Sequence, residues 1–307
     1  MRGRAPILLH CLVLLGCLLT VAAAQQPSST SIRVRMGFRT LGNTNRNDMI
    51  AAMKAWLNTV AKERNLDAVP LPYVFDSISE LENALRHDQL DVFSASMEEF
   101  TLLEKTFPAA GMFAIKVNGK ITEQYVLLVR RDRGRSDLKE LRGENLVLMD
   151  HLRTSLAPLW LDVELMRQKL PAGGRFFGKI THVTKVNQAI LPVFFRQADA
   201  AIVTRASFET AAELNPQLAR EIQVLTSSQD LVPGIGGYRK GATSKAVDFY
   251  RTEALRLTDS PAGRLVLNLF QADSIVEIRE SDLARTRSFL AEYARLKAEA
   301  DRRRTAP

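Results

Sequence analysis

Four polar loops in this sequence each follow a β-forming run and lead into a helix-forming run. They cover residues 37–47, 94–98, 150–155 and 204–207. Hydroxyl groups donate hydrogen bonds to anions, and guanidinium groups add positive charge. In open α/β sheets, ligands bind outside the carboxyl ends of the strands, where such loops lie. The residues therefore predict a site for a small anionic ligand. Its candidate side chains are Arg39, Thr40, Ser94, Ser96, His151, Arg153, Thr154, Ser155, Thr204 and Arg205.

The sharpest of these loops is Asp150 to Ser155, which combines a guanidinium, two hydroxyls and a helix start. Helix N-termini carry unpaired N–H groups and partial positive charge, which favour an anion. Each residue also has a structural interpretation, because Thr154 or Ser155 can be an ordinary N-cap and Arg153 an ordinary surface charge. If the anion hypothesis holds, Arg153→Ala weakens ligand binding strongly and leaves thermal stability nearly unchanged.

Catalytic and metal-binding patterns are missing from the sequence. Cys11 and Cys17 both lie in the first apolar run, so removal of that run excludes disulfides, cysteine nucleophiles and zinc–thiolate sites. The other histidines lack metal-ligand spacing, and no Gly-x-Ser-x-Gly elbow or Gly-Lys-Ser/Thr phosphate loop occurs. The glycines at 234–237 have the wrong spacing for a dinucleotide loop and predict a flexible loop. We expect no enzyme activity, no metal and no cofactor.

The N-terminus has the pattern of an export signal. Arg2 and Arg4 precede an apolar stretch from Ile7 to Val21, and three alanines end at Ala24. This stretch is shorter than the roughly 20 residues needed to span a bilayer. Residues 1–24 are therefore predicted to be a signal peptide that directs export of the chain. A permanent anchor or a lipoprotein signal at Cys17 are the alternatives, and the apolar run past Cys17 disfavours the second.

The charge of the chain is positive but scattered. The 307 residues include 42 Lys and Arg and 34 Asp and Glu, and removal of residues 1–24 leaves 40 basic and 34 acidic side chains, a net charge of +6. The only dense basic run is Arg302 to Arg304, which is typical of a solvated tail. Without a basic stripe interleaved with aromatic residues, nucleic acid is not an expected partner.

Strand and helix patterns alternate along the chain and predict an α/β protein with two lobes. Each lobe is expected to be a mostly parallel sheet flanked by helices, with a ligand cleft between the lobes. The charged run after Val129 is interpreted as a linker. The predicted organisation is lobe 1 over residues 31–129, lobe 2 over 130–225, and a return to lobe 1 with C-terminal helices over 226–303.

Several stretches, taken in order, resemble one family of proteins. The stretches are residues 81–92, 125–143, 150–155, 188–203 and 260–263. They are similar to the phosphate/phosphite/phosphonate-binding proteins of ABC transporters, which are type II periplasmic solute-binding proteins. The resemblance implies that hydroxyl groups at the start of a second-lobe helix hold an oxyanion, which assigns that role to Thr154 and Ser155 with Arg153 beside them. The sequence departs from the family pattern at Leu156 and Ala198, where glycine is usual.

These observations predict an exported, monomeric solute-binding protein that captures a small oxyanion for the membrane permease of an ABC transporter. Ligand contact with both lobes would stabilise a closed form. The first alternative is a ligand-sensing module that presents its occupancy to the ectodomain of a membrane sensor kinase. An exported hydrolase is the third possibility, and it would need a His/Asp pairing that the spacing does not indicate.

Overall fold

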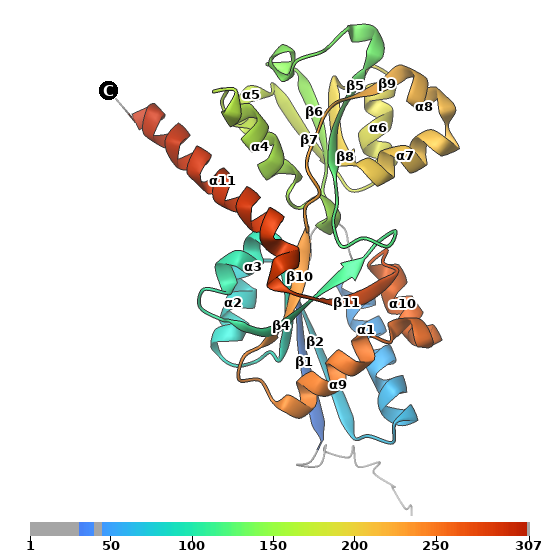
Figure 1. Cartoon of the computed structure of the whole chain (residues 1–307). Coiled ribbons are helices and arrows are strands. Elements are labelled where there is room, and N and C mark those ends of the chain that lie inside the picture. Colours follow the sequence, from blue (N-terminus) through green and yellow to red (C-terminus); the bar gives the residue numbers. More distant parts are fainter. Residues whose placement is uncertain (1–30, 40–44, 306–307) are drawn as a thin grey trace, which may run out of the picture.

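The computed structural model describes residues 31–39 and 45–305, which form two lobes that each contain one sheet (Figure 1). Helices flank both sheets, and the two-lobed α/β class predicted from the sequence is confirmed. The predicted signal peptide, Cys17 and Thr40 lie outside the described residues. Within the described part of the chain, no helix is both long and apolar enough to cross a bilayer.

Lobe 1 contains a six-stranded sheet in the order β11-β4-β10-β3-β1-β2. Only β1 pairs in parallel, with β2 on one side and β3 on the other. The pairs that involve β10 and β11 are antiparallel, so the sheet is mixed rather than mostly parallel. The strands are β1 (Ile32–Arg39), β2 (Ala68–Phe75), β3 (Val92–Ser96), β4 (Ala109–Lys116), β10 (Gly234–Arg239) and β11 (Ser274–Ile278).

The helices of lobe 1 begin at polar caps, some of which the sequence predicts. A capping box of Ser77 and Glu80 starts α2, with Glu80 N–H donating to Ser77 Oγ at 3.2 Å. Asn45 caps α1, and Asp48 lies in its first turn. The helices are α1 (Arg46–Glu63), α2 (Ile78–Arg86), α3 (Met97–Leu103), α9 (Ser244–Ala254) and α10 (Pro261–Leu269).

Lobe 2 contains a five-stranded sheet in the order β7-β6-β8-β5-β9. The pairs of β6 with β7 and β8 are parallel, and the pairs of β5 with β8 and β9 are antiparallel. The strands are β5 (Tyr125–Arg130), β6 (Asn145–Met149), β7 (Lys179–Val183), β8 (Ala200–Thr204) and β9 (Ile222–Ser227). The helices are α4 (Ala157–Arg167), α5 (Gly173–Phe176), α6 (Val186–Phe194), α7 (Arg205–Leu214) and α8 (Pro216–Glu221).

The chain crosses between the lobes twice, and the first crossing lies earlier than the sequence predicts. β4 belongs to lobe 1 and β5 to lobe 2, so the first crossing falls within residues 117–124 instead of at residue 130. The charged run after Val129 is not a linker, because Arg130 is buried and paired with Asp132 at 2.9 Å and with Glu221. The return crossing covers residues 228–233, and backbone hydrogen bonds between Glu123 and Leu231 join the two crossings.

The stretch predicted to be a flexible glycine loop is strand β10, in the interior of the lobe 1 sheet. Its glycines permit close packing rather than flexibility. A Cβ atom on Gly236 would lie 2.0 Å from the ring of Phe113, and one on Gly237 would lie 2.9 Å from Ala109 Cβ. A glycine-rich composition is typical of a loop, but here the glycines are needed because the neighbouring strand approaches closely.

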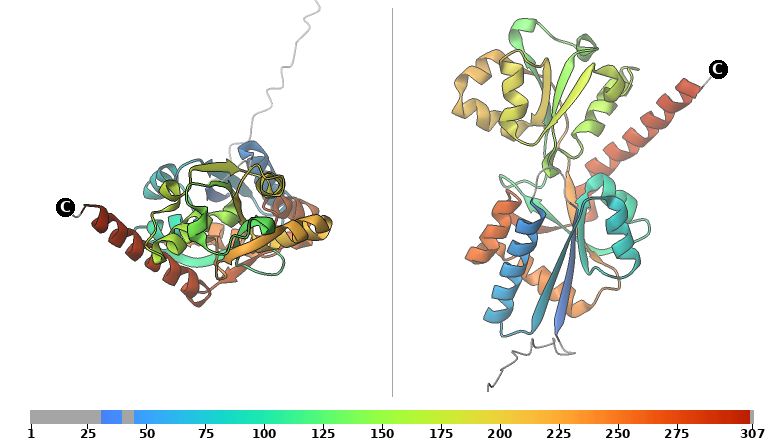
Figure 2. Two further views of the ribbon diagram at one scale, coloured as in Figure 1. Left: turned by 90° about the horizontal axis from the view of Figure 1, so that it is seen from above. Right: turned by 180° about the vertical axis from the view of Figure 1, so that it is seen from behind.

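The last helix, α11 (Glu280–Thr305), contacts lobe 2 as well as lobe 1, to which the sequence assigns the C-terminal helices. Figures 1 and 2 show it passing from lobe 1 toward α4 of lobe 2, with its C-terminal end projecting from the molecule. Arg287 is bound to Glu104 of lobe 1 at 2.8 Å, and Glu292 is bound to Arg167 of α4 at 2.8 Å. Phe289, which lies between Arg287 and Glu292 in the sequence, is buried.

Candidate ligand-binding site

Three adjoining cavities lie where the lobes meet. The apolar pocket extends into lobe 1 and has a volume of about 50 Å³. The crossing pocket, of about 10 Å³, is lined by Lys120, Glu123 and Arg153, and it shares Leu152 with the apolar pocket. The open cleft, of about 280 Å³, lies at the starts of α6 and α7, and Arg153 lines both it and the crossing pocket. Arg153 is therefore placed where two of the cavities meet.

Arg153 is not an ordinary surface charge. Its Nε donates to Glu123 Oε1, and only 13% of the Arg153 side chain and 8% of the Glu123 side chain are exposed. Burial raises the pKa of the Glu123 carboxyl above its usual value, and the neighbouring Arg153 opposes that rise.

The loop before α4 is organised by its own polar groups. Thr154 is buried, and its hydroxyl donates to the Met149 carbonyl at 2.5 Å and accepts from the His151 N–H at 3.1 Å. His151 Nδ1 accepts from the Arg153 N–H at 3.2 Å, which caps a 3₁₀ turn over Leu152–Thr154. Burial lowers the pKa of His151, and the charge of Arg153 lowers it further.

Ser155 links this loop to the return crossing, because its hydroxyl donates to the Pro233 carbonyl at 2.8 Å. Helix α4 begins at Ala157 rather than directly after a Ser155 cap, and Pro158 falls in its first turn, where proline is tolerated. The hydroxyl donors of Thr154 and Ser155 are thus engaged with main-chain carbonyls in this structure.

The lobe 1 candidates lie at the ends of β1 and β3. Arg39 Nε donates to Glu99 Oε1 at 2.9 Å, and each of these side chains is 14% exposed. Ser96 caps α3 through a capping box with Glu99, with Glu99 N–H donating to Ser96 Oγ at 3.2 Å. Ser94 is half-buried and lines the apolar pocket together with Arg39.

The remaining candidates support the frame of lobe 2. Thr204 is fully buried, and its hydroxyl caps α7 by accepting from the Ser207 N–H at 3.2 Å. Arg205 Nε donates to the Gln124 side chain, and the Arg205 N–H donates to the Gln124 carbonyl at 2.7 Å. Arg205 therefore fixes the first crossing against the start of α7.

Comparison with known proteins identifies the family. A family model described as "ABC transporter, phosphonate, periplasmic substrate-binding protein" matches residues 40–283. The chain belongs to this family. The resemblance noted in the sequence is confirmed, and so is the expectation that the chain is no enzyme, because the family is a substrate-binding component of transporters. No curated protein sequence matches the chain.

Solved structures similar to this substrate-binding protein support the fold. XAC2383 from Xanthomonas citri, bound to chloride ion, has 15% identity and a TM-score of 0.65, over 87% of this chain and 99% of its own. A phosphonate-transporter binding protein from Pseudomonas aeruginosa (PA3383) has 12% identity and a TM-score of 0.60, over 87% and 88%. PhnD1 from Prochlorococcus marinus, in complex with methylphosphonate, has 11% identity and a TM-score of 0.57, over 85% and 98%.

The structure of this substrate-binding protein brings together some of the predicted residues and adds others. Arg39 and Ser94 line the apolar pocket, and Arg153 lines the two cavities beside it. His151, Thr154, Ser155, Ser96, Thr204 and Arg205 support the loops and helix starts around them. The lining polar residues of the crossing pocket and the open cleft that the sequence analysis did not select are Asn118, Lys120, Glu123, Asn187, Ser207 and Thr210.

Only part of this second group carries a signal in the sequence. Ser207 lies in a loop that the strand pattern selects, three residues after a buried strand end, and Asn187 lies in the first turn of a helix. Glu123 lies in a crossing without any motif, so its pairing with Arg153 needs the three-dimensional structure. In residues 31–39 and 45–305, no group of three His, Cys, Asp or Glu side chains could hold a metal ion.

Proposed function

We propose that this chain binds a small oxyanion of the phosphonate or phosphate type between its lobes and delivers it to the membrane permease of an ABC transporter. Membership of the family supports a small ligand, a permease partner and an extracytoplasmic location. The observation that carries the proposal is the position of Arg153 between the crossing pocket and the open cleft. A signal peptide over residues 1–24 and a monomeric state complete the proposal.

The open cleft has the polar groups that an oxyanion needs. Asn187 and Ser207 lie in the first turns of α6 and α7, so N–H groups and partial positive charge lie near both side chains. Arg153 adds a guanidinium, which binds oxyanions in a planar, bidentate geometry. The three groups follow the carboxyl ends of the parallel strands β6, β7 and β8, the usual position of ligands in such sheets.

The carboxylates near the cations set how an anion is held. Glu123 neutralises Arg153, and Glu99 neutralises Arg39, so a ligand does not meet two uncompensated charges. An incoming anion therefore shares each guanidinium with its carboxylate. This arrangement favours a ligand whose affinity comes from several neutral donors as well as from charge.

The first experiment is a thermal-shift and calorimetric screen of residues 25–307 against phosphate, phosphite, methylphosphonate and sulfate. A ligand at a hundred times its dissociation constant adds about 2.7 kcal/mol to the unfolding free energy. Arg153→Gln is expected to abolish the shift. Arg196→Gln is the matched control, because Arg196 is an arginine of lobe 2 that is 60% exposed and paired with Asp132. Equal affinity in wild type and Arg153→Gln would contradict the assigned site.

The signalling alternative differs in the partner and not in the ligand. The family description names an ABC transporter, which favours transport. Reconstituted permease whose ATPase activity rises with the loaded protein would support delivery. Binding of the loaded protein to a sensor kinase ectodomain, with no effect on the permease, would replace transport by sensing.

A further inference from the structure

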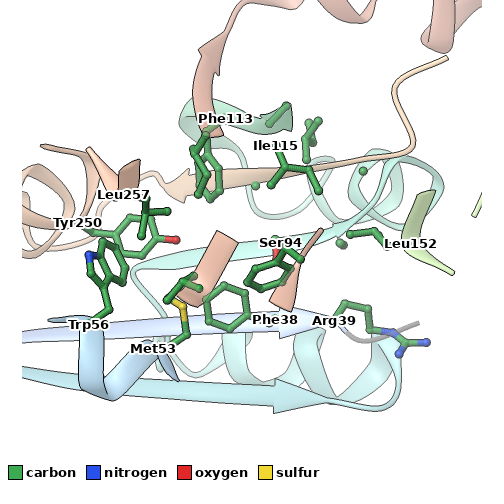
Figure 3. A pocket seen from close by; sticks show the side chains of 18 residues that line it. Phe38, Arg39, Met53, Trp56, Ser94, Phe113, Ile115, Leu152, Tyr250 and Leu257 are labelled. Carbon is green, nitrogen blue, oxygen red and sulfur yellow. The ribbon is translucent and has the colours of Figure 1, made fainter. Parts of the chain in front are cut away.

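The apolar pocket of lobe 1 has no role in holding a bare oxyanion. It extends from the junction of the lobes into the space between the sheet and the helices α1, α9 and α10 (Figure 3). Figure 3 shows Trp56, Tyr250 and Leu257 at one end and Arg39 and Leu152 at the other. Trp56 and Tyr250 are each 1% exposed, so the inner end is part of the core of lobe 1.

The size and chemistry of this pocket define what it accepts. A water-sized group needs roughly 10–15 Å³, so a volume of about 50 Å³ holds about four such groups in a row or cluster. The inner lining is formed by Met53, Trp56, Phe113, Leu257 and Val266, which offer few partners for water. An apolar cavity of this kind favours hydrocarbon over water.

We propose that the ligand is an organic oxyanion with an unbranched alkyl group of about three or four carbons, and that the alkyl group occupies this pocket. The inference rests on the proposed function and specifies its substrate class. The mouth of the pocket fits the head group of such a ligand, because Arg39 and Ser94 line it. Ile115, Leu152 and Gly234 line both this pocket and the crossing pocket, where Arg153 and Lys120 lie. Charge at the mouth and hydrocarbon within match the two ends of an alkylphosphonate.

Leu152 gives this pocket a connection to lobe closure. It belongs to the loop before α4 in lobe 2, yet it lines a cavity whose other residues belong to lobe 1. An alkyl chain in the pocket therefore contacts both lobes through apolar surface. Part of the free energy of closing the lobes then comes from burial of the ligand's hydrocarbon.

The test is the affinity of the mature protein for the n-alkylphosphonates from methyl to hexyl. Each buried methylene is expected to lower the dissociation constant about fourfold up to propyl or butyl, after which the gain stops. Methylphosphonate binding as tightly as its propyl and butyl homologues would overturn the alkyl pocket and leave the proposed function standing. If no member of the series binds, the alkyl pocket is refuted, and the proposed function is refuted as well if phosphate and phosphite also fail to bind.

Two further measurements locate the hydrocarbon. Val266 lines the pocket and is 2% exposed, so Val266→Leu should weaken butylphosphonate about fourfold and leave methylphosphonate unchanged. Val163→Leu is the matched control, because Val163 is a buried valine of α4 that does not line the pocket.

In a Trp160→Phe background, Trp56 is the remaining tryptophan, and its emission should respond to butylphosphonate and not to methylphosphonate. Equal responses to the two ligands would overturn the inference even if Val266→Leu does not fold.

Discussion

Replacement of Arg153 by alanine tests the buried ion pair most directly. Replacing an exposed, unpaired arginine by alanine would leave stability nearly unchanged. Arg153, however, is paired with Glu123, whose side chain is only 8% exposed. Arg153→Ala leaves that carboxylate in a buried site without its cation. Loss of one partner of a buried pair costs about 3–5 kcal/mol. The revised prediction is therefore a large loss of stability together with the loss of ligand binding.

The loss should depend on pH in a defined direction. Burial raises the pKa of Glu123, and removal of Arg153 takes away the charge that opposes this rise. A carboxyl whose pKa is higher in the folded state than in the unfolded state binds more protons when the protein is folded. The free energy of unfolding therefore falls as pH rises from the unfolded-state pKa through the folded-state pKa. Arg153→Ala should therefore be closest to wild type at acidic pH and most destabilised at neutral pH.

The assay is thermal unfolding of wild type and variants without ligand at about pH 5 and pH 7.5. A loss of about 3 kcal/mol corresponds to a fall in Tm of about 5 °C for a protein of this size. The double variant Arg153→Ala with Glu123→Gln should regain much of the stability and none of the ligand affinity. A neutral-pH Tm of Arg153→Ala within one degree of wild type would refute the reasoning.

Three other substitutions separate the roles of neighbouring residues. Glu123→Gln should tighten anion binding about a hundredfold, because a carboxylate roughly 6 Å from a bound anion repels it by about 3 kcal/mol at an effective dielectric constant of about 20. Calorimetry with methylphosphonate checks this prediction. Unchanged affinity would mean that the anion binds elsewhere. His151→Asn retains a cap acceptor. Because the pKa of His151 is lowered in the fold, the wild type should lose stability as pH falls below about 6.5, and the variant should not. Denaturant unfolding from pH 5 to 8 checks this, and identical pH dependence of the two proteins would contradict it. Ser155→Ala should cost about 1 kcal/mol through loss of the bond to Pro233 and leave ligand affinity within about threefold, so a large loss of affinity would restore the direct contact that the family resemblance implies.

The elements that local chemistry specifies could be predicted from the sequence. The capping box at Ser77 and the buried strand from Tyr125 depend on neighbouring residues and on uninterrupted apolar character. Strand β10 could not be predicted, because a run of glycines is typical of a loop. Glycine is needed there because the Phe113 ring on the adjacent strand occupies the space that a Cβ on Gly236 would fill. The position of the first lobe boundary could not be predicted for a similar reason. The charged residues after Val129 have the pattern of a linker, but Arg130 is buried and pairs with Glu221, which is 91 residues away.

The site follows the same division. Loops at strand ends are visible in the sequence, and they led to Arg39, Ser94 and Arg153, which line the cavities. The carboxylates opposite them are not visible, because Glu123 is 30 residues from Arg153 and Glu99 is 60 residues from Arg39. A pattern of donors identifies where an anion could bind, but the net charge at that position depends on residues that only the fold brings near.

Helix α11 has a consequence for the direction in which solute enters. A pair of bodies joined only by two strands can twist and bend in several directions, but here α11 holds lobe 1 through Glu104 and lobe 2 through Arg167. These attachments lie on one flank of the molecule, and α7 and α10 lie on the opposite flank (Figure 1). We therefore expect relative movement of the lobes to be smallest near α11 and largest on the opposite flank. The open cleft is lined by Asn118 and Leu214, and we expect a solute to enter on that side.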